Sequence, residues 1–147
     1  PEEPPAPELP PGPPEEGAQI RLPPGDGDLS FLEGCWKSEA GLSGTMSGNR
    51  LHYVYCFGTD GAAQVRVEVL DGSGKTAFYC PATGKAEMKS GVLTIKDSGG
   101  KCPADEPDFA ETTVVCSPVQ GKDADCVIQS QDGEALTTKF TYQGAKR

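Results

Sequence analysis

The sequence has no apolar run of about 18 residues, no positively charged N-terminal region, and almost no stretch with an apolar period of about 3.6 residues. The first two absences predict that no part of this chain inserts into a membrane. They also imply that any signal peptide or membrane anchor lies upstream of Pro1. The third absence argues against a helical domain.

Clustered basic residues are also missing. The net charge is −9, and seven acidic residues with Arg21 place −6 of it in residues 1–28, which leaves −3 for the rest of the chain. In that remainder the Lys and Arg residues are scattered singly, apart from Lys146 and Arg147 at the end. Phosphate-binding surfaces need such residues in clusters, so the sequence predicts neither nucleic acid nor an anionic membrane surface as a partner.

Motifs for metal binding and catalysis are absent as well. The sequence contains no CxxC pair, and His52 is its only histidine. Zinc sites usually bring their ligands in close pairs, and a general base needs a nucleophile or carboxylate held against it. We therefore predict no metal, no cofactor and no catalytic residue, and expect a protein that is not an enzyme. Turnover that is abolished by His52→Ala would revive the enzyme hypothesis.

The first 28 residues have the composition of a linker. They hold ten of the fourteen prolines, most of the net charge and no aromatic residue. Such a segment buries too little apolar surface to offset the entropy of ordering it. The sequence therefore predicts a disordered Pro/Glu-rich tether over residues 1–28 and one domain over residues 29–147.

Six cysteines are spread through that domain, at wide spacing: Cys35, Cys56, Cys80, Cys102, Cys116 and Cys126. An even number at such spacing predicts a disulfide framework in a periplasmic or secreted protein. Fifteen connectivities are open. The pair Cys116–Cys126 is the first choice because the two residues flank a hairpin-length connection. Cys80–Cys102 would fasten the Pro103 loop to the sheet, which leaves Cys35–Cys56.

Short runs rich in β-branched and aromatic residues, separated by glycine turns, indicate an all-β domain. In Ala63–Val69, for example, valines alternate with polar residues, which is typical of a strand with one buried face. The predicted strands are Phe31–Ser38, Leu51–Phe57, Ala63–Val69, Thr76–Cys80, Lys85–Lys89, Val92–Lys96, Ala110–Ser117, Asp125–Gln131 and Ala135–Tyr142. Short connections favour an antiparallel up-and-down meander of about eight strands, and we prefer a closed barrel to a sandwich.

The run Phe31-Leu32-Glu33-Gly34-Cys35-Trp36 resembles the Gly-x-Trp opening of calycin or lipocalin barrels, with Gly34 and Trp36 at the matching positions. The resemblance implies that Trp36 closes the barrel floor and that Gly34 lets the backbone pass close beneath it. It also makes Lys139 the candidate for the basic residue that packs over this tryptophan in lipocalins.

A second resemblance is to the cysteine-bearing C-terminal domain of SrfA-type bacterial virulence-associated proteins, and it covers most of residues 29–147. It depends on FLEGCWKSEAGL at 31–42, YVYCF at 53–57, Cys80-Pro81 and the three later cysteines. It implies a virulence-associated, extracytoplasmic accessory domain behind a proline-rich linker, and brings no established chemistry with it.

The aromatic residues offer the only candidate for a ligand site: Trp36, Tyr53, Tyr55, Phe57 and Phe78 either line a pocket or form the core. We favour core, and hence a non-enzymatic binding or protein-interaction module whose contact surface is a barrel mouth built around the Gly44–Asn49 loop. One alternative is a lipocalin-like carrier of a small apolar ligand, which requires a hollow interior. The other is a small periplasmic inhibitor of a protease or lysozyme, which requires a rigid projecting loop.

Overall fold

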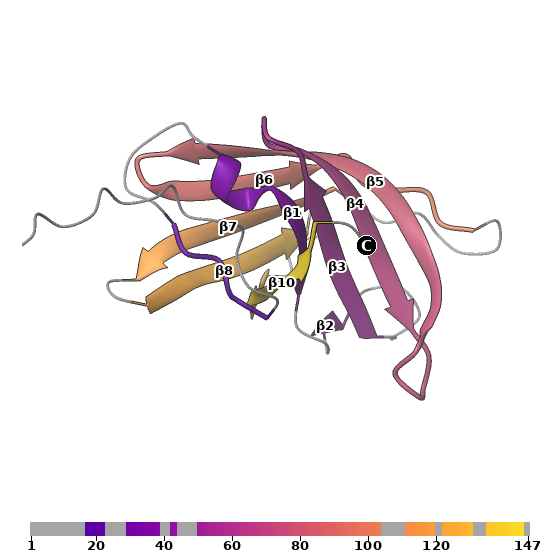
Figure 1. Cartoon of the computed structure of the whole chain (residues 1–147). Helices are drawn as coiled ribbons and strands as arrows, with labels where there is room; N and C mark the ends of the chain where they lie inside the picture. The colour runs from indigo at the N-terminus through magenta and orange to yellow at the C-terminus, as the bar shows by residue number, and fades with distance from the viewer. Residues whose placement is uncertain are drawn as a thin grey trace, which may run out of the picture.

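The chain folds into one antiparallel sheet that curls into a nearly closed barrel (Figure 1). The computed structural model describes residues 17–22, 29–38, 42–43, 50–103, 111–119, 122–130 and 135–145. Neighbouring strands follow the order β10-β1-β3-β4-β5-β6-β7-β8-β9, and β2 pairs with β3 beside this path. The predicted all-β antiparallel meander with a barrel form is therefore confirmed.

The strand bounds are β1 Gly34–Ser38, β2 Leu42–Ser43, β3 Arg50–Phe57, β4 Ala62–Leu70, β5 Thr76–Lys89, β6 Val92–Asp97, β7 Thr112–Val119, β8 Lys122–Ser130, β9 Ala135–Thr138 and β10 Phe140–Gly144. One short 3-10 helix, η1 Ser30–Leu32, precedes β1. From β3 to β9 each strand pairs with its neighbour in sequence, although the connection from β6 to β7 is longer than the others and spans residues 98–111.

Alternation along the central strands separates the inside of the barrel from the outside. Tyr53 of β3 lies opposite Val67 of β4, which in turn lies opposite Cys80 of β5, and all three are buried. Their neighbours along each strand point to the other face, as Arg66 and Tyr79 do. The period of two in the sequence therefore sets which side chains form the core.

The barrel closes because the last strand changes partner. Ala135–Thr138 pairs with β8, and after Lys139 the chain continues as β10, which pairs with β1. The sequence predicts one continuous strand over Ala135–Tyr142, whereas the structure divides it at Lys139. This break joins the first and last parts of the meander, so neither β1 nor β8 is left as a full-length open edge.

The segment Gly17–Leu22, which we call the leading segment, packs against this junction. The Tyr142 N–H donates to the Ala18 carbonyl at 2.8 Å, and the Ala124 N–H of β8 donates to the Ile20 carbonyl at 2.8 Å. The predicted tether boundary at residue 28 is therefore wrong for these six residues, because Ile20 supplies an apolar side chain that the core buries. Residues 1–16 and 23–28 lie outside the described residues.

A second difference concerns β5, which runs unbroken from Thr76 to Lys89 where the sequence predicts two strands. The Thr83 carbonyl accepts from the Ser98 N–H, so the backbone groups of Thr83 point away from β4. Two residues earlier, Pro81 has the same orientation, and its missing N–H costs no bond to β4. Proline therefore fits inside this strand because it lies where no partner strand needs its donor.

The predicted first strand, Phe31–Ser38, begins instead as a helical turn. Leu32 is fully buried, and the backbone changes direction at Gly34, whose φ is +110°. A Cβ atom at Gly34 would lie 2.6 Å from ring atoms of Tyr142. Only glycine tolerates both the left-handed backbone and the aromatic ring above it.

Several predicted features lie outside the described residues: the Gly44–Asn49 loop, Ala110 at the start of one predicted strand and Gln131 at the end of another. The glycine turn between β5 and β6 is described. Ser90 and Gly91 both have positive φ, 53° and 79°, which is the conformation of a two-residue type I′ hairpin.

We predict that Gly34→Ala lowers the free energy of unfolding by at least about 2 kcal/mol more than Gly74→Ala does. Both glycines have positive φ, but a Cβ atom at Gly74 meets nothing within 4 Å. The matched pair thus separates backbone strain from the clash with Tyr142. Urea unfolding of the oxidised proteins measures both values, and equal losses would contradict the close packing over Gly34.

Candidate functional site

The aromatic residues of β3 form a stacked row inside the barrel. Tyr53, Tyr55 and Phe57 share one face of the strand, and their ring centroids are 6.4 Å and 6.0 Å apart. Phe140 of β10, two strands away in the sheet, meets Tyr55 edge-on at 5.6 Å. Such offset and edge-to-face contacts are the favoured arrangements of aromatic pairs, so these rings fill interior space against one another.

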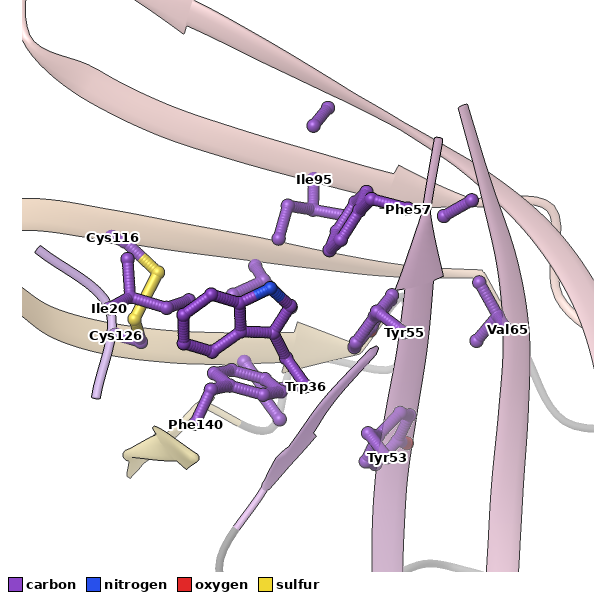
Figure 2. Packing of buried hydrophobic residues seen from close by; sticks show 14 of the residues in the cluster. Ile20, Trp36, Tyr53, Tyr55, Phe57, Val65, Ile95, Cys116, Cys126 and Phe140 are labelled. Carbon is purple, nitrogen blue, oxygen red and sulfur yellow. A yellow bond between two sulfur atoms is a disulfide. The ribbon is translucent and has the colours of Figure 1, made fainter. Parts of the chain in front are cut away.

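Trp36 lies in the same interior, and Figure 2 shows its indole in the buried cluster with Ile20, Tyr55 and Phe140. Its Nε1–H donates to the Leu32 carbonyl at 2.8 Å, which satisfies the polar atom of a buried indole. Tyr142 packs edge-on against it at 5.1 Å. Lys139, the residue suggested for a position over Trp36, is exposed, and the ring that packs against the indole is that of Tyr142.

The structure therefore brings together four of the five predicted ligand-site residues, Trp36, Tyr53, Tyr55 and Phe57, as buried neighbours in one cluster. Phe78 is only partly buried and packs at the margin of this cluster. Tyr79 points to the outer face, where it is 45 % exposed.

A buried polar group that the sequence analysis missed lies beside the aromatic row. Asp97, at the end of β6, is 6 % exposed and accepts hydrogen bonds from the N–H groups of Gly99 and Thr112, at 2.9 and 3.0 Å. Its second oxygen accepts from the Thr112 hydroxyl. The carboxylate thus ties the end of β6 to the start of β7. The alternation of the sequence does indicate an inward position for Asp97, because it has the same parity as the inward residues Leu93 and Ile95.

Burial raises the pKa of Asp97 above its ordinary value, although the hydrogen bonds from Thr112 and Gly99 act in the opposite direction. The Tyr55 hydroxyl is buried, and the Asp97 carboxylate is close enough to affect its pKa. The hydroxyl has no hydrogen-bond partner within the described part of the chain. Burial is the main reason that the pKa of Tyr55 is raised well above its usual value, and Asp97 adds to it.

His52 lies on the outer side of β3, with the parity opposite to Tyr53 and Tyr55. It is half-buried, and its Nδ1 is 2.9 Å from the Ser38 carbonyl oxygen. A carbonyl only accepts, so Nδ1 carries the proton in this contact. The ring is therefore oriented by a backbone group, which is an ordinary structural role for a histidine.

The disulfides join Cys35 to Cys56, Cys80 to Cys102, and Cys116 to Cys126, the three pairs put forward from the sequence. The first links β1 and β3 across the outer face, and the third links β7 and β8 across the inner face. The second fastens the segment after β6 to the middle of β5. Three disulfides are consistent with an oxidising location outside the cytoplasm.

Among the described residues, no cluster of three or more His, Cys, Asp or Glu side chains is placed to hold a metal ion. Over the same residues, no helix has the length and apolar character needed to cross a membrane.

Comparison with known proteins gives no relative: no protein-family model, curated protein or solved structure matches this chain significantly.

We predict that Asp97→Asn removes a pH dependence of stability. The unfolded chain releases the Asp97 proton near pH 4, about the ordinary value, while the folded protein holds it to higher pH. Stability therefore falls as pH rises through this window. Asparagine can accept the same two N–H bonds and donate to the Thr112 hydroxyl. The variant should gain stability relative to the parent as pH rises from about 3 to 7.

The control for this prediction is Asp97→Ala, which removes the acceptor and should cost about 1–3 kcal/mol by leaving buried donors unpaired. Urea unfolding at a series of pH values measures all three proteins. A constant difference between parent and Asp97→Asn across the series would show that the carboxyl titrates alike in folded and unfolded chains.

We also predict that replacing Cys116 and Cys126 together by Ala destabilises the barrel more than replacing Cys35 and Cys56. Chain entropy alone gives about 3 kcal/mol for each pair, and slightly more for Cys35–Cys56, which closes the longer loop of 21 residues against 10. The Cys116–Cys126 sulfurs, however, belong to the core cluster, so their loss also leaves a cavity. The midpoints of thermal unfolding of the two double variants give the order. A lower midpoint for the variant that lacks Cys35–Cys56 would mean that loop entropy dominates.

Proposed function

We propose that this chain is a non-enzymatic binding module, displayed behind its proline-rich leader in the bacterial periplasm or outside the cell, which contacts a protein partner through the exterior of the barrel. The observation that carries this proposal is the interior packed with aromatic rings. It makes the outer surface the part of the described barrel that is open to a partner.

A carrier of small apolar molecules needs a cavity of about 300 Å³ or more. In this barrel Trp36, Tyr55 and Phe140 are each at most 2 % exposed, and the ring pairs around them lie 5.1 to 6.4 Å apart. These separations are those of rings in contact. A ligand would have to displace core side chains, so the packing favours an interaction module over a carrier.

The outer face offers a contact point on β4 and β5. The Arg66 guanidinium carbon lies 3.8 Å from the centroid of the Tyr79 ring, and Tyr79 is 45 % exposed. Tyrosine and arginine are over-represented among the residues that dominate protein–protein binding energy. A stacked pair is also ordered before binding, which lowers the entropy lost on association. This pair lies within the described sheet, whereas the loop Gly44–Asn49 expected at the barrel mouth does not.

The covalent framework supports the proposed location. Reducing compartments keep thiols free, whereas this domain uses all six of its cysteines in disulfides. A proline-rich, acidic leader is suited to hold such a domain away from its point of attachment. The proposal therefore combines an oxidising compartment, an extended spacer and a packed barrel.

The carrier alternative is tested by titrating the oxidised protein with an apolar fluorescent probe and a fatty acid while the emission of Trp36 is recorded. Trp36 is the only tryptophan and lies in the core, so it reports directly on the interior. We expect no saturable change in its emission. Uptake of one ligand per chain with quenching of Trp36 would overturn the packed-interior argument and select the carrier.

The interaction itself is tested by affinity capture from an extracytoplasmic fraction, followed by binding measurements with the purified partner. We expect a saturable complex that Tyr79→Ala weakens by about tenfold or more, the effect of a hot-spot residue. Val127→Ala is the matched control, because Val127 is also an exposed apolar residue, at 36 %, on a different strand. Equal loss in both variants, or no saturable partner, would contradict the proposed surface. A captured hydrolase that is inhibited in the complex would select the inhibitor alternative.

A further inference from the structure

The leading segment, Gly17–Leu22, is held from both sides like an added strand. On one side the Gly17 N–H donates to the Tyr142 carbonyl at 2.9 Å and the Tyr142 N–H donates to the Ala18 carbonyl at 2.8 Å. On the other side the Ala124 N–H donates to the Ile20 carbonyl at 2.8 Å. The segment thus occupies the gap between residues 122–125 of β8 and strand β10, which we call the seam.

The seam also recognises side chains. Ile20 is 2 % exposed, and Figure 2 shows it beside the Cys116–Cys126 disulfide and the Trp36 ring. At the rim, Arg21 Nε lies 3.1 Å from Asp123 Oδ1, and both side chains are exposed. Extended peptides bind at sheet edges through main-chain hydrogen bonds and through pockets for their side chains. The seam offers backbone bonds on two edges, one apolar anchor and one charge at the rim.

The segment is separable from the barrel that it completes. No disulfide holds it, since the first cysteine is Cys35, and six residues, 23–28, connect it to the rest of the described domain. The other strands pair without it, from β10 through β1 to β9. The segment also fits imperfectly, because Gln19 Oε1 is buried and has no hydrogen-bond partner in the described region.

We propose that the seam is an exchangeable strand-binding slot, and that the partner it fits is the leading segment of a second copy of this chain. A second copy supplies the same backbone groups, the same isoleucine and the same arginine, so exchange needs no new complementary surface. Six connecting residues span up to about 20 Å when extended, which allows the segment to leave its own seam. The inference goes beyond the proposed function, because binding another protein through the outer face requires no such exchange.

The slot is tested with the full chain and a labelled peptide of residues 15–22, followed by fluorescence anisotropy. In the parent protein the resident segment competes at an effective concentration on the order of millimolar, so the peptide should bind poorly. In Ile20→Ala the resident loses its anchor, and this protein should bind the peptide at least about tenfold more tightly than the parent does. A peptide that carries the same alanine should lose about tenfold or more. An Ile20→Ala protein with intact disulfides and native near-UV circular dichroism that does not bind the peptide would overturn the slot.

A second variant covers the case in which Ile20→Ala does not fold. Arg21→Glu changes only an exposed pair, and it should increase peptide binding about two- to fivefold over the parent by setting the resident segment against Asp123. Lys89→Glu is the control, since Lys89 is exposed at the end of β5, whereas the backbone bonds of the segment go to β8 and β10. Equal peptide affinity in all three proteins would contradict the slot.

Exchange between copies is tested by mixing isotopically light and heavy parent protein at about millimolar concentration and recording native mass spectra. We expect mixed dimers, and we expect an excess of the peptide of residues 15–22 to dissociate them. A protein that remains monomeric at this concentration, or dimers that persist in saturating peptide, would overturn the second copy as the partner.

Discussion

Closure of the barrel depends on one local event, the change of partner at Lys139. Before this residue the chain pairs with β8, and after it the chain pairs with β1, so a single stretch of ten residues joins the two ends of the meander. Without this change the sheet would have two exposed edges and its aromatic inner face would be open to water. The positions of Trp36, Tyr55 and Phe140 in one core follow from closure.

Both disulfides and core packing stabilise the closed form of this small barrel. The disulfide Cys35–Cys56 reinforces the β1–β3 pair on the outside, next to the strand on which closure depends. The disulfide Cys116–Cys126 lies inside, where it also fills core space. Because domains of about this size have a net stability of only about 5–15 kcal/mol, each cross-link is a large share of the total.

The alternation of apolar and polar residues predicts the fold best where one face of a strand is exposed to solvent and the other is buried. The inward positions of Tyr55 and Val67 could be deduced in this way, and strand adjacency led to the cysteine pair Cys116–Cys126. The continuity of β5 through Pro81 could not be deduced, because it depends on which edge of the strand lacks a partner. The leading segment was also missed, since its one decisive residue, Ile20, lies in a region whose overall composition is that of a linker.

The most direct test of closure is native-state amide hydrogen exchange at Thr141. The amide of Tyr142 faces the leading segment, so by alternation the amide of its neighbour Thr141 faces β1. A closed barrel predicts that Thr141 exchanges only by global unfolding, with the same free energy as core amides of β4 such as Val67. Exchange of Thr141 at a much lower free energy than Val67 would contradict closure and describe an open, curled sheet.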